Sequence, residues 1–221
     1  MSGMRDGMLT VYAIPVSLYC AKLRIVLRHK DLDWTEIPPP GGYGSDEYKR
    51  MVPAGNLPAL RNGGLLIADS EAISEYLEEV FPNPPMLPVD AGERAQIRAR
   101  SRFHDTRLEP AVRRLFPYIT AAPGPGELAP MAAEISTRLG QFANVIRDVP
   151  AGSDLTLGDC GYPITFLWIH ALAPLLDIKI AWPDPVRDWS DGLDRHHAVA
   201  AERASYGKTL NDWLKREWAG H

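Results

Sequence analysis

The sequence predicts two domains, an α/β domain followed by an all-helical bundle, and three observations support this. In the first eighty or so residues, segments typical of strands alternate with amphipathic segments typical of helices. Prolines then cluster within residues 82–93, a composition typical of a stiff linker. Beyond them, apolar residues recur at helical spacing without a strand pattern. We therefore expect an α/β domain at 8–82, a linker at 83–92 and a helical domain at 93–221.

The elements of the α/β domain follow from local patterns taken along the chain. Strand-like and helix-like segments alternate, RNGG at 61–64 predicts a hairpin turn, and Ser45 and Ser70 are expected to cap helices. On the helix expected at 18–29, Lys22 belongs to the polar face. The predicted order is strand, helix, strand, helix, strand, strand, helix, at 9–14, 18–29, 33–39, 45–51, 57–60, 65–68 and 71–81. This order predicts a parallel βαβ unit, an antiparallel hairpin and a closing helix.

The second domain is predicted to be a bundle of helices. Thr156 and Asp159 form the T-x-x-D pattern of a capping box, in which two side chains satisfy backbone N–H groups at a helix start. This pair is expected to serve folding and not catalysis. The helices are predicted at 93–118, 127–148, 156–180 and 198–218.

Composition limits the classes of function. The 24 Lys and Arg against 28 Asp and Glu give a formal net charge of −4, which does not favour nucleic acid or an anionic membrane as a partner. Cys20 and Cys160 are too few for a disulfide framework or a thiolate zinc site, and His104 and the pair at 196–197 lack metal-ligand spacing, so these histidines are expected in surface or capping roles. The first residues lack the apolar run of a signal peptide. We expect a cytoplasmic protein without a metal.

A predicted strand leads into a predicted helix through residues 14–24, IPVSLYCAKLR. Ser17 and Cys20 in this segment have the spacing of a redox Cys-x-x-Cys motif, with serine in place of the first cysteine. A hydroxyl at a helix N-terminus can donate a hydrogen bond to a thiolate, which the helix dipole also favours. The missing thiol suggests that the reacting sulfur comes from a ligand. The alternative is that Ser17 is only an N-cap.

Two further segments, VPAGNLPAL at 52–60 and ADSEAI at 68–73, follow the Ser17 loop in order. With the domain organisation, these motifs resemble the cytosolic glutathione transferases of the serine type, which include theta, zeta, tau and many bacterial members. The likeness extends over essentially the whole chain. It implies a thioredoxin-like βαβαββα first domain, a helical second domain, and a homodimer.

The resemblance implies a site for glutathione as co-substrate. Ser17 would hold the glutathione sulfur as a thiolate without attacking anything itself. Pro58 would be the family's cis-proline, so that the backbone of Leu57 pairs with the cysteinyl part of glutathione as an added strand would. Asn56 stands where the family often has Gln or Lys. Val52 replaces the usual Asn, which weakens the likeness of this loop.

The acid-Ser pair before the third predicted helix is also similar to the family's pattern. Ser70 and the first N–H groups of the helix would bind the γ-glutamyl carboxylate, and Asp69 would bind its ammonium group. A plain helix cap is the simpler alternative.

The resemblance places a small electrophilic substrate beside the first long helix of the second domain. Phe103, Arg107 and Tyr118 are the candidates there, although Pro110 leaves open which side of the helix faces the substrate. The implied reaction is conjugation of glutathione to an electrophile, as in detoxification, or a glutathione-dependent isomerisation. The alternatives are a non-catalytic ligand-binding or protein-binding relative, and a thiol-disulfide reductase acting through Cys20.

Overall fold

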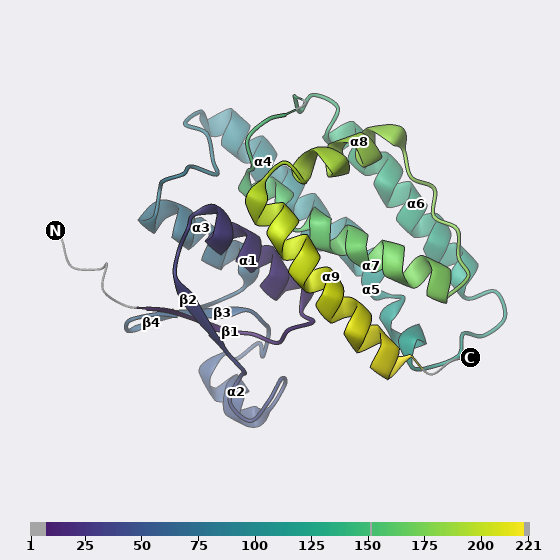
Figure 1. The fold of residues 1–221 in the computed structure, drawn as a ribbon, viewed down its shortest axis with the longest axis horizontal. Helices are drawn as coiled ribbons and strands as arrows, with labels where there is room; N and C mark the ends of the chain where they lie inside the picture. Colours follow the sequence, from purple (N-terminus) through teal and green to yellow (C-terminus); the bar gives the residue numbers. More distant parts are fainter. Residues whose placement is uncertain (1–7, 151, 219–221) are drawn as a thin grey trace. The chain divides into compact units, whose positions relative to one another are not determined.

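The computed structural model describes residues 8–150 and 152–218, which form two compact units, Met1–Met86 and Leu87–His221 (Figure 1). The division falls inside the segment 83–92. The first seven residues, for which no apolar leader was expected, and the last three residues of the predicted helical domain lie outside the described residues.

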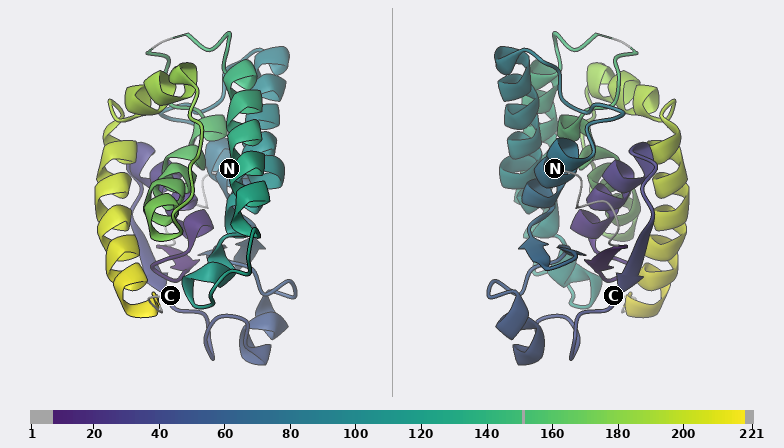
Figure 2. Two further views of the ribbon diagram at one scale, coloured as in Figure 1. Left: turned by 90° about the vertical axis from the view of Figure 1, so that its right-hand side faces the viewer. Right: turned by 90° about the vertical axis from the view of Figure 1, so that its left-hand side faces the viewer.

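The first unit is built on a four-stranded mixed sheet in the order β2-β1-β3-β4. β1 pairs with β2 in parallel and with β3 antiparallel, and β3 pairs antiparallel with β4. Helices α1 and α3 lie on one face of the sheet and α2 on the other (Figures 1 and 2). This confirms the predicted α/β order. The bounds are β1 Leu9–Tyr12, α1 Leu18–His29, β2 Trp34–Ile37, α2 Asp46–Met51, β3 Ala59–Asn62, β4 Leu65–Ala68 and α3 Ser70–Val80.

Helix α1 buries more of its surface than its sequence pattern indicates. Leu23, Ile25 and Leu27 are fully buried, as the apolar spacing predicts. Lys22, expected on the polar face, is only 1% exposed, so that expectation is wrong. Its Nζ lies 2.7 Å from Oε2 of Glu71 on α3, and this ion pair permits the burial of the ammonium group.

A second buried lysine fixes the end of the first unit. Lys30 Nζ lies 2.6 Å from Oε2 of Glu78 and donates hydrogen bonds to the carbonyl oxygens of Phe81 at 2.7 Å and Pro84 at 3.0 Å. The Glu78 carboxylate in turn accepts from the Met86 N–H at 3.0 Å. One ion pair therefore holds both the last turn of α3 and the chain that follows it.

The second unit is helical, but several of its elements differ from the prediction: the helix predicted at 156–180 is a 3-10 helix followed by a shorter α-helix. The helix predicted at 93–118 is divided, because a π-helical turn precedes Pro110, which has no N–H to continue the helical hydrogen bonds. Helix α8 was not predicted. The bounds are α4 Ala91–Phe103, π-helix His104–Leu108, α5 Glu109–Arg113, 3-10 helix Phe116–Ile119, α6 Leu128–Val145, 3-10 helix Leu157–Asp159, α7 Tyr162–Leu175, α8 Asp184–Leu193 and α9 His197–Glu217.

An aromatic cluster forms the core of the second unit. The ring of Phe142 stacks on Tyr162, with centroids 4.0 Å apart, and Trp189 meets both rings edge-on. The indole N–H of Trp168 donates to the Tyr206 hydroxyl at 2.7 Å. No helix in the described part of the chain is both long and apolar enough to cross a membrane.

The predicted capping box is present at the start of the 3-10 helix Leu157–Asp159. The Thr156 N–H donates to Asp159 Oδ2 at 2.9 Å. The Arg100 side chain, which the sequence analysis did not link to this box, donates from Nε to Asp159 Oδ1 at 2.9 Å and from Nη2 to the Thr156 hydroxyl at 2.9 Å. The box thus also anchors α4 through a buried ion pair.

Candidate functional site

The first unit brings the three predicted motif segments to one end of its sheet. Tyr12 at the end of β1 lies opposite Ala59 at the start of β3, and Ala59 lies opposite Ala68 at the end of β4. The chain before β3 and the chain after β4 are directly joined, because the Asp69 N–H donates to the Pro58 carbonyl at 3.3 Å. The loop after β1, which carries Ser17, begins at the same end of the sheet.

Ser17 is the N-cap of α1. Its backbone is extended, with φ −69° and ψ 120°, and its hydroxyl oxygen accepts from the Cys20 N–H at 3.3 Å. The predicted capping role is therefore present. It leaves the hydroxyl proton available for a second hydrogen bond, because accepting a bond at oxygen does not use the O–H donor.

Cys20 sits one turn into α1 and is only 1% exposed. Burial raises the pKa of its thiol, and this effect outweighs the lowering effects of a hydrogen bond with the Ser17 side chain and of the Arg24 charge. The thiol is therefore protonated near neutral pH. A thiol of this kind is a poor nucleophile, because the thiolate is the reactive form.

The Leu57–Pro58 bond is cis, as the motif resemblance predicted. Neither the N–H nor the C=O of Leu57 has a hydrogen-bond partner among residues 8–150 and 152–218. Backbone groups in folded proteins are rarely left unpaired. The arrangement suits the addition of a short extended peptide at this position.

Asn56 presents a polar side chain beside Leu57. Its amide oxygen Oδ1 is buried and has no hydrogen-bond partner in the described structure, and its backbone carbonyl accepts from the Tyr48 hydroxyl at 2.9 Å. Burial raises the pKa of Tyr48 to about 12, so the phenol remains protonated and keeps donating. This support from Tyr48 could not be predicted from the sequence, because an aromatic residue on a short helix is more typical of packing than of a hydrogen bond.

Helix α3 begins at Asp69 rather than at Ser70, so the prediction that Ser70 caps this helix is wrong. Asp69 Oδ1 accepts from the N–H groups of Glu71 at 2.9 Å and Ala72 at 3.2 Å. Asp69 has φ 88°, a region that residues other than glycine rarely occupy. Because both capping bonds go to Oδ1, the other carboxylate oxygen stays available. Ser70 is the first residue of the helix and is 5% exposed.

The three candidates of the second unit lie in different surroundings. Phe103 packs parallel to Phe142, with ring centroids 6.1 Å apart, and lines a pocket of about 390 Å³. Arg107 lies on the π-helical turn and is exposed. Tyr118 donates to Glu127 Oε2 at 3.1 Å. Within the described ranges, no hydrogen bond, ion pair or ring contact joins any two of the three.

His104 is not at the surface, so the expected surface or capping role is wrong. It is 1% exposed, with Nδ1 2.6 Å from Asp105 Oδ1 and Nε2 2.7 Å from the Thr165 hydroxyl. No space remains on one side of its ring, because a Cβ added at Gly161 would lie 2.4 Å from it. His104 thus joins the π-helical turn to α7 as part of the core.

Comparison with known proteins gives one family-model match, which lies in the first unit, and sequence relatives that match part of the chain. Residues 11–85 match the family model of the glutathione S-transferase N-terminal domain. Glutathione S-transferase Z1 of Arabidopsis thaliana is 37% identical over 98 residues, 43% of this chain and 44% of the relative. A stringent starvation protein A homolog of Pasteurella multocida is 33% identical over 106 residues, 48% of each chain. The chain thus spans less than half the length of each of these relatives.

The fold has relatives over nearly its whole length. A glutathione S-transferase of the silkworm Bombyx mori, described as diazinon-metabolizing, superposes with a TM-score of 0.76, covering 92% of this chain and 98% of that one at 17% identity. At that identity the likeness shows the fold alone. Residues 11–85 thus match the glutathione S-transferase N-terminal domain family, and the chain as a whole shares its fold with the silkworm protein.

Proposed function

We propose that the protein is a glutathione transferase of the serine type, in which Ser17 donates its hydroxyl proton to the glutathione thiolate. The observation that supports this most strongly is the Ser17 hydroxyl at the N-terminus of α1, at the sheet end where the Leu57 backbone has no partner among the described residues. A hydroxyl donor and the positive end of a helix dipole both stabilise a thiolate. The thiolate is then the nucleophile that attacks the electrophile.

The peptide part of glutathione would lie along Leu57 and α3. Its cysteinyl backbone would pair with the N–H and C=O of Leu57 as an added antiparallel strand. The γ-glutamyl carboxylate would bind at the N-terminus of α3 with the Ser70 hydroxyl, and the ammonium group would bind the second carboxylate oxygen of Asp69. Asn56 would contribute its unpaired amide oxygen as an acceptor.

The reaction is either conjugation to a small electrophile or a glutathione-dependent isomerisation. Both begin with the same thiolate. Conjugation is favoured, because it requires only that the protein stabilise the thiolate and leave room for an electrophile. Isomerisation requires further groups that position the substrate. Phe103, Arg107 and Tyr118 remain proposals for the electrophile contacts. Detoxification is the matching physiological role.

A non-catalytic ligand-binding or protein-binding role is the second candidate. It is favoured by the Pasteurella multocida relative, whose name states no enzymatic activity. A third, disulfide reduction through Cys20, is disfavoured because that thiol is buried and its pKa is raised. Glutathione binding without turnover would support the second candidate.

Location and assembly are proposals carried from the family resemblance. We propose a cytoplasmic homodimer, since two cysteines in 221 residues suit a reducing compartment and the family usually pairs its subunits. Light scattering on the purified full chain measures the mass directly. A mass of one chain across the concentrations used for turnover would remove the dimer from the account.

Calorimetric titration with glutathione, together with turnover assays, tests the proposed site. Asp69→Asn and Asn56→Ala are expected to weaken binding by about fivefold to tenfold each, since each removes a polar group that contacts the ligand. The control is Asn62→Ala, because Asn62 lies at the other end of β3, where its side chain bonds to Tyr76. Turnover is then measured with an aryl chloride, an epoxide and an unsaturated ketone. Equal binding by all three variants and the wild type would contradict the site.

A further inference from the structure

The peptide group between Asn56 and Leu57 is held on its carbonyl side and has a donor left over on its amide side. The Asn56 carbonyl accepts from the Tyr48 hydroxyl at 2.9 Å. Leu57 is only 7% exposed, yet its N–H has no partner among residues 8–150 and 152–218. The Asn56–Leu57 bond is trans, and in a planar trans peptide the C=O and the N–H point in opposite directions. Holding the Asn56 carbonyl therefore also fixes the direction of the Leu57 N–H.

Tyr48 is a rigid support for that carbonyl. Its side chain is fully buried, and its ring lies beside Tyr12 at the end of β1, with ring centroids 6.0 Å apart. The Tyr48 N–H donates to the Ser45 hydroxyl oxygen at 3.1 Å, and that hydroxyl donates to the Pro40 carbonyl at 2.7 Å. Both the backbone and the ring of Tyr48 are thus held, so its hydroxyl stays at the Asn56 carbonyl.

The chain from Tyr48 to Asn56 forms a loop that this hydroxyl closes. The Val52 N–H donates to the Tyr48 carbonyl at 2.9 Å, and the Gly55 N–H donates to the Val52 carbonyl at 2.7 Å. Gly55 has φ 64°, a conformation that glycine adopts without steric cost. This turn brings Asn56 back to Tyr48, eight residues earlier in the sequence. The loop therefore ends on the peptide group that carries the Leu57 N–H.

The Tyr48 hydroxyl also remains a donor over a wide range of pH. Burial raises its pKa to about 12, with smaller contributions from the nearby Cys20, Tyr12 and Tyr43. The phenol therefore stays protonated at neutral pH and well above it. A hydrogen bond accepted by a carbonyl polarises its peptide group, which strengthens the N–H of that group as a donor. Tyr48 thus affects both the direction and the strength of the Leu57 donor.

We propose that Tyr48 is a positioning residue of the glutathione site, which aims the Leu57 N–H at the carbonyl oxygen of the cysteinyl residue by holding the Asn56 carbonyl. This role rests on the proposed function. It assigns the orientation of one ligand contact to a residue that does not itself touch the ligand. Phenylalanine in place of Tyr48 would fill the same space without the hydrogen bond, so the hydroxyl and not the ring is responsible.

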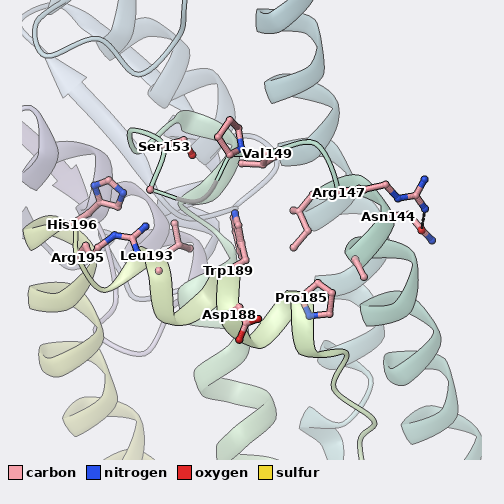
Figure 3. Close-up of a pocket in the computed structure, with 15 residues that line it drawn as sticks. Asn144, Arg147, Val149, Ser153, Pro185, Asp188, Trp189, Leu193, Arg195 and His196 are labelled. Atoms are coloured by element: carbon pink, nitrogen blue, oxygen red, sulfur yellow. Dashed lines mark hydrogen bonds between the residues drawn. The ribbon is translucent and has the colours of Figure 1, made fainter.

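Nuclear magnetic resonance of the full chain measures this at the Leu57 amide. In the wild type, the Leu57 N–H proton signal should move downfield on saturation with glutathione, because the N–H gains an acceptor. In Tyr48→Phe the movement should be at most about half as large, since a hydrogen bond weakens steeply when its donor is misaligned. Calorimetry alone would count glutathione bound anywhere, and the helical unit has a pocket of about 450 Å³ lined by Trp189 and Arg195 among others (Figure 3). The Leu57 signal reports on the first unit by itself.

Two truncated ligands isolate the same contact. γ-Glutamyl-cysteinamide keeps the cysteinyl carbonyl, and γ-glutamyl-cysteamine lacks it. The wild type should bind the first about fivefold more tightly, and in Tyr48→Phe this ratio should fall below about twofold. A merely structural loss would weaken both ligands alike and keep their ratio at the wild-type value.

Tyr76→Phe is the matched control. It also removes one tyrosine hydroxyl of the first unit, which accepts from the Asn62 side chain at 2.9 Å at the other end of β3. Its Leu57 signal and its ligand ratio should match those of the wild type. The thiol pKa of bound glutathione should be the same in Tyr48→Phe as in the wild type, because Ser17 on α1 is unchanged.

Failure of this role can be distinguished from failure of the proposed site. A Leu57 signal that glutathione moves equally in wild type and Tyr48→Phe, or an unchanged ratio of the truncated ligands, would overturn the role of Tyr48 and leave the site in place. A thiol pKa that rises in Tyr48→Phe would place its effect at the sulfur and would also overturn the role. A Leu57 signal that glutathione does not move in the wild type would contradict the site itself, and the role of Tyr48 with it.

Discussion

Ser17 and Cys20 lie one helical turn apart on α1, and their surroundings give them opposite chemistry. Ser17 is half-buried and places its hydroxyl at the start of the helix, whereas Cys20 is 1% exposed and burial raises the pKa of its thiol. The same turn therefore offers a hydrogen bond to a thiolate but no thiolate of its own. This is the physical basis for expecting that the sulfur belongs to a bound ligand.

The burial of Cys20 leads to a prediction at this scale. Because its thiol is protonated and inaccessible, it should react with a disulfide reagent at least ~100-fold more slowly in the native protein than in the unfolded chain. Cys20→Ala should keep glutathione-dependent turnover within about twofold of the wild type and cost about 1 kcal/mol of stability. Thiol labelling and turnover assays measure both. Loss of disulfide-reductase activity in Cys20→Ala would instead support the reductase.

The role of a residue could be predicted where it depends on the adjacent sequence. It could not be predicted where it depends on the backbone conformation or on a neighbour far away along the chain. Ser17 as an N-cap and Pro58 as the cis-proline are local features, and both are present. The capping of α3 by Asp69 rather than Ser70 is decided by the backbone at φ 88°, which the sequence does not reveal. His104 was misplaced for a related reason, since its burial depends on Thr165 and Gly161, far away along the chain.

Elements of the first unit are joined by ion pairs whose partners lie on different elements. Arg24 on α1 donates two hydrogen bonds to Glu36 on β2, from Nε at 2.6 Å and from Nη2 at 2.7 Å. Burial acts to raise the pKa of Glu36, but the hydrogen bonds and charge of Arg24 outweigh it and the pKa is lowered overall. The pair therefore links the stability of α1 and β2 to pH.

This linkage has a definite sign. The folded pKa of Glu36 lies below its ordinary value of 4.5, so the pair contributes stability above that value and loses it as the pH falls through the folded pKa. Arg24→Gln should therefore destabilise the protein near pH 7, and the difference from wild type should shrink as the pH falls below 4.5, through the folded pKa of Glu36. Urea unfolding at several pH values measures this, with Arg50→Gln on α2 as the control. A difference that is constant with pH would argue against it.

The Lys30–Glu78 pair gives a larger prediction, because both side chains are buried. Lys30→Met leaves the Glu78 carboxylate without its cation and should lower the free energy of unfolding by about 3–5 kcal/mol. The double change Lys30→Met with Glu78→Leu removes both charges and should be less destabilising than the single change. Denaturant unfolding of the three proteins measures this. If Lys30→Met unfolds like wild type, the pair does not hold the end of the first unit.

In the helical unit, Asp159 carries both the capping box and the ion pair with Arg100. Asp159→Ala should cost about 3 kcal/mol or more, because it leaves a buried guanidinium unpaired as well as removing a cap. Thermal unfolding measured by circular dichroism would show this. Asp90→Ala, which removes an exposed N-cap from α4, should cost only about 1 kcal/mol. Equal losses in the two variants would contradict the added role of Arg100.

Helices could be predicted where apolar residues recur at regular helical spacing and capping residues stand at the ends. Helix α1 begins and ends at the predicted residues, because Ser17 caps it and its apolar face is regular. Helix α8 was missed because its sequence, DPVRDWSDGL, is mostly polar and contains a proline and a glycine. Only Val186, Ser190 and Leu193 of this helix are buried, so the tertiary packing of those three positions decides its conformation.

For the whole molecule, the order of the two units and their α/β or helical character could be predicted from composition and from the spacing of apolar residues. The chemistry of the site did not follow from either. The proposed site depends on bringing Ser17, Leu57 and Asp69 to one end of the sheet, which the antiparallel pairing of β1 with β3 and of β3 with β4 accomplishes. The motif order made this arrangement foreseeable. The proposed electrophile contacts were not foreseeable in the same way, since the divided helix around Pro110 changes the faces that its residues present.

If the account is right, glutathione binds the folded chain and not the unfolded one. Saturation at about 100 times Kd should then stabilise the wild type by about 2.7 kcal/mol. Oxidised glutathione, which lacks a free thiol, should stabilise it less. Differential scanning calorimetry measures both shifts. A Tm that does not respond to glutathione would leave the non-catalytic candidate as the better account.

The central claim is that Ser17 stabilises the thiolate of bound glutathione, and the ultraviolet thiolate absorbance of the complex from about pH 5 to 9 measures this most directly. In the wild type and in Ser45→Ala, which loses a matched serine N-cap on α2, the thiol pKa should lie well below its ordinary value of about 8.5. In Ser17→Ala, which should still bind glutathione, it should rise by about one to two units. An equally depressed pKa in Ser17→Ala, or an ordinary pKa in the wild type, would contradict the account.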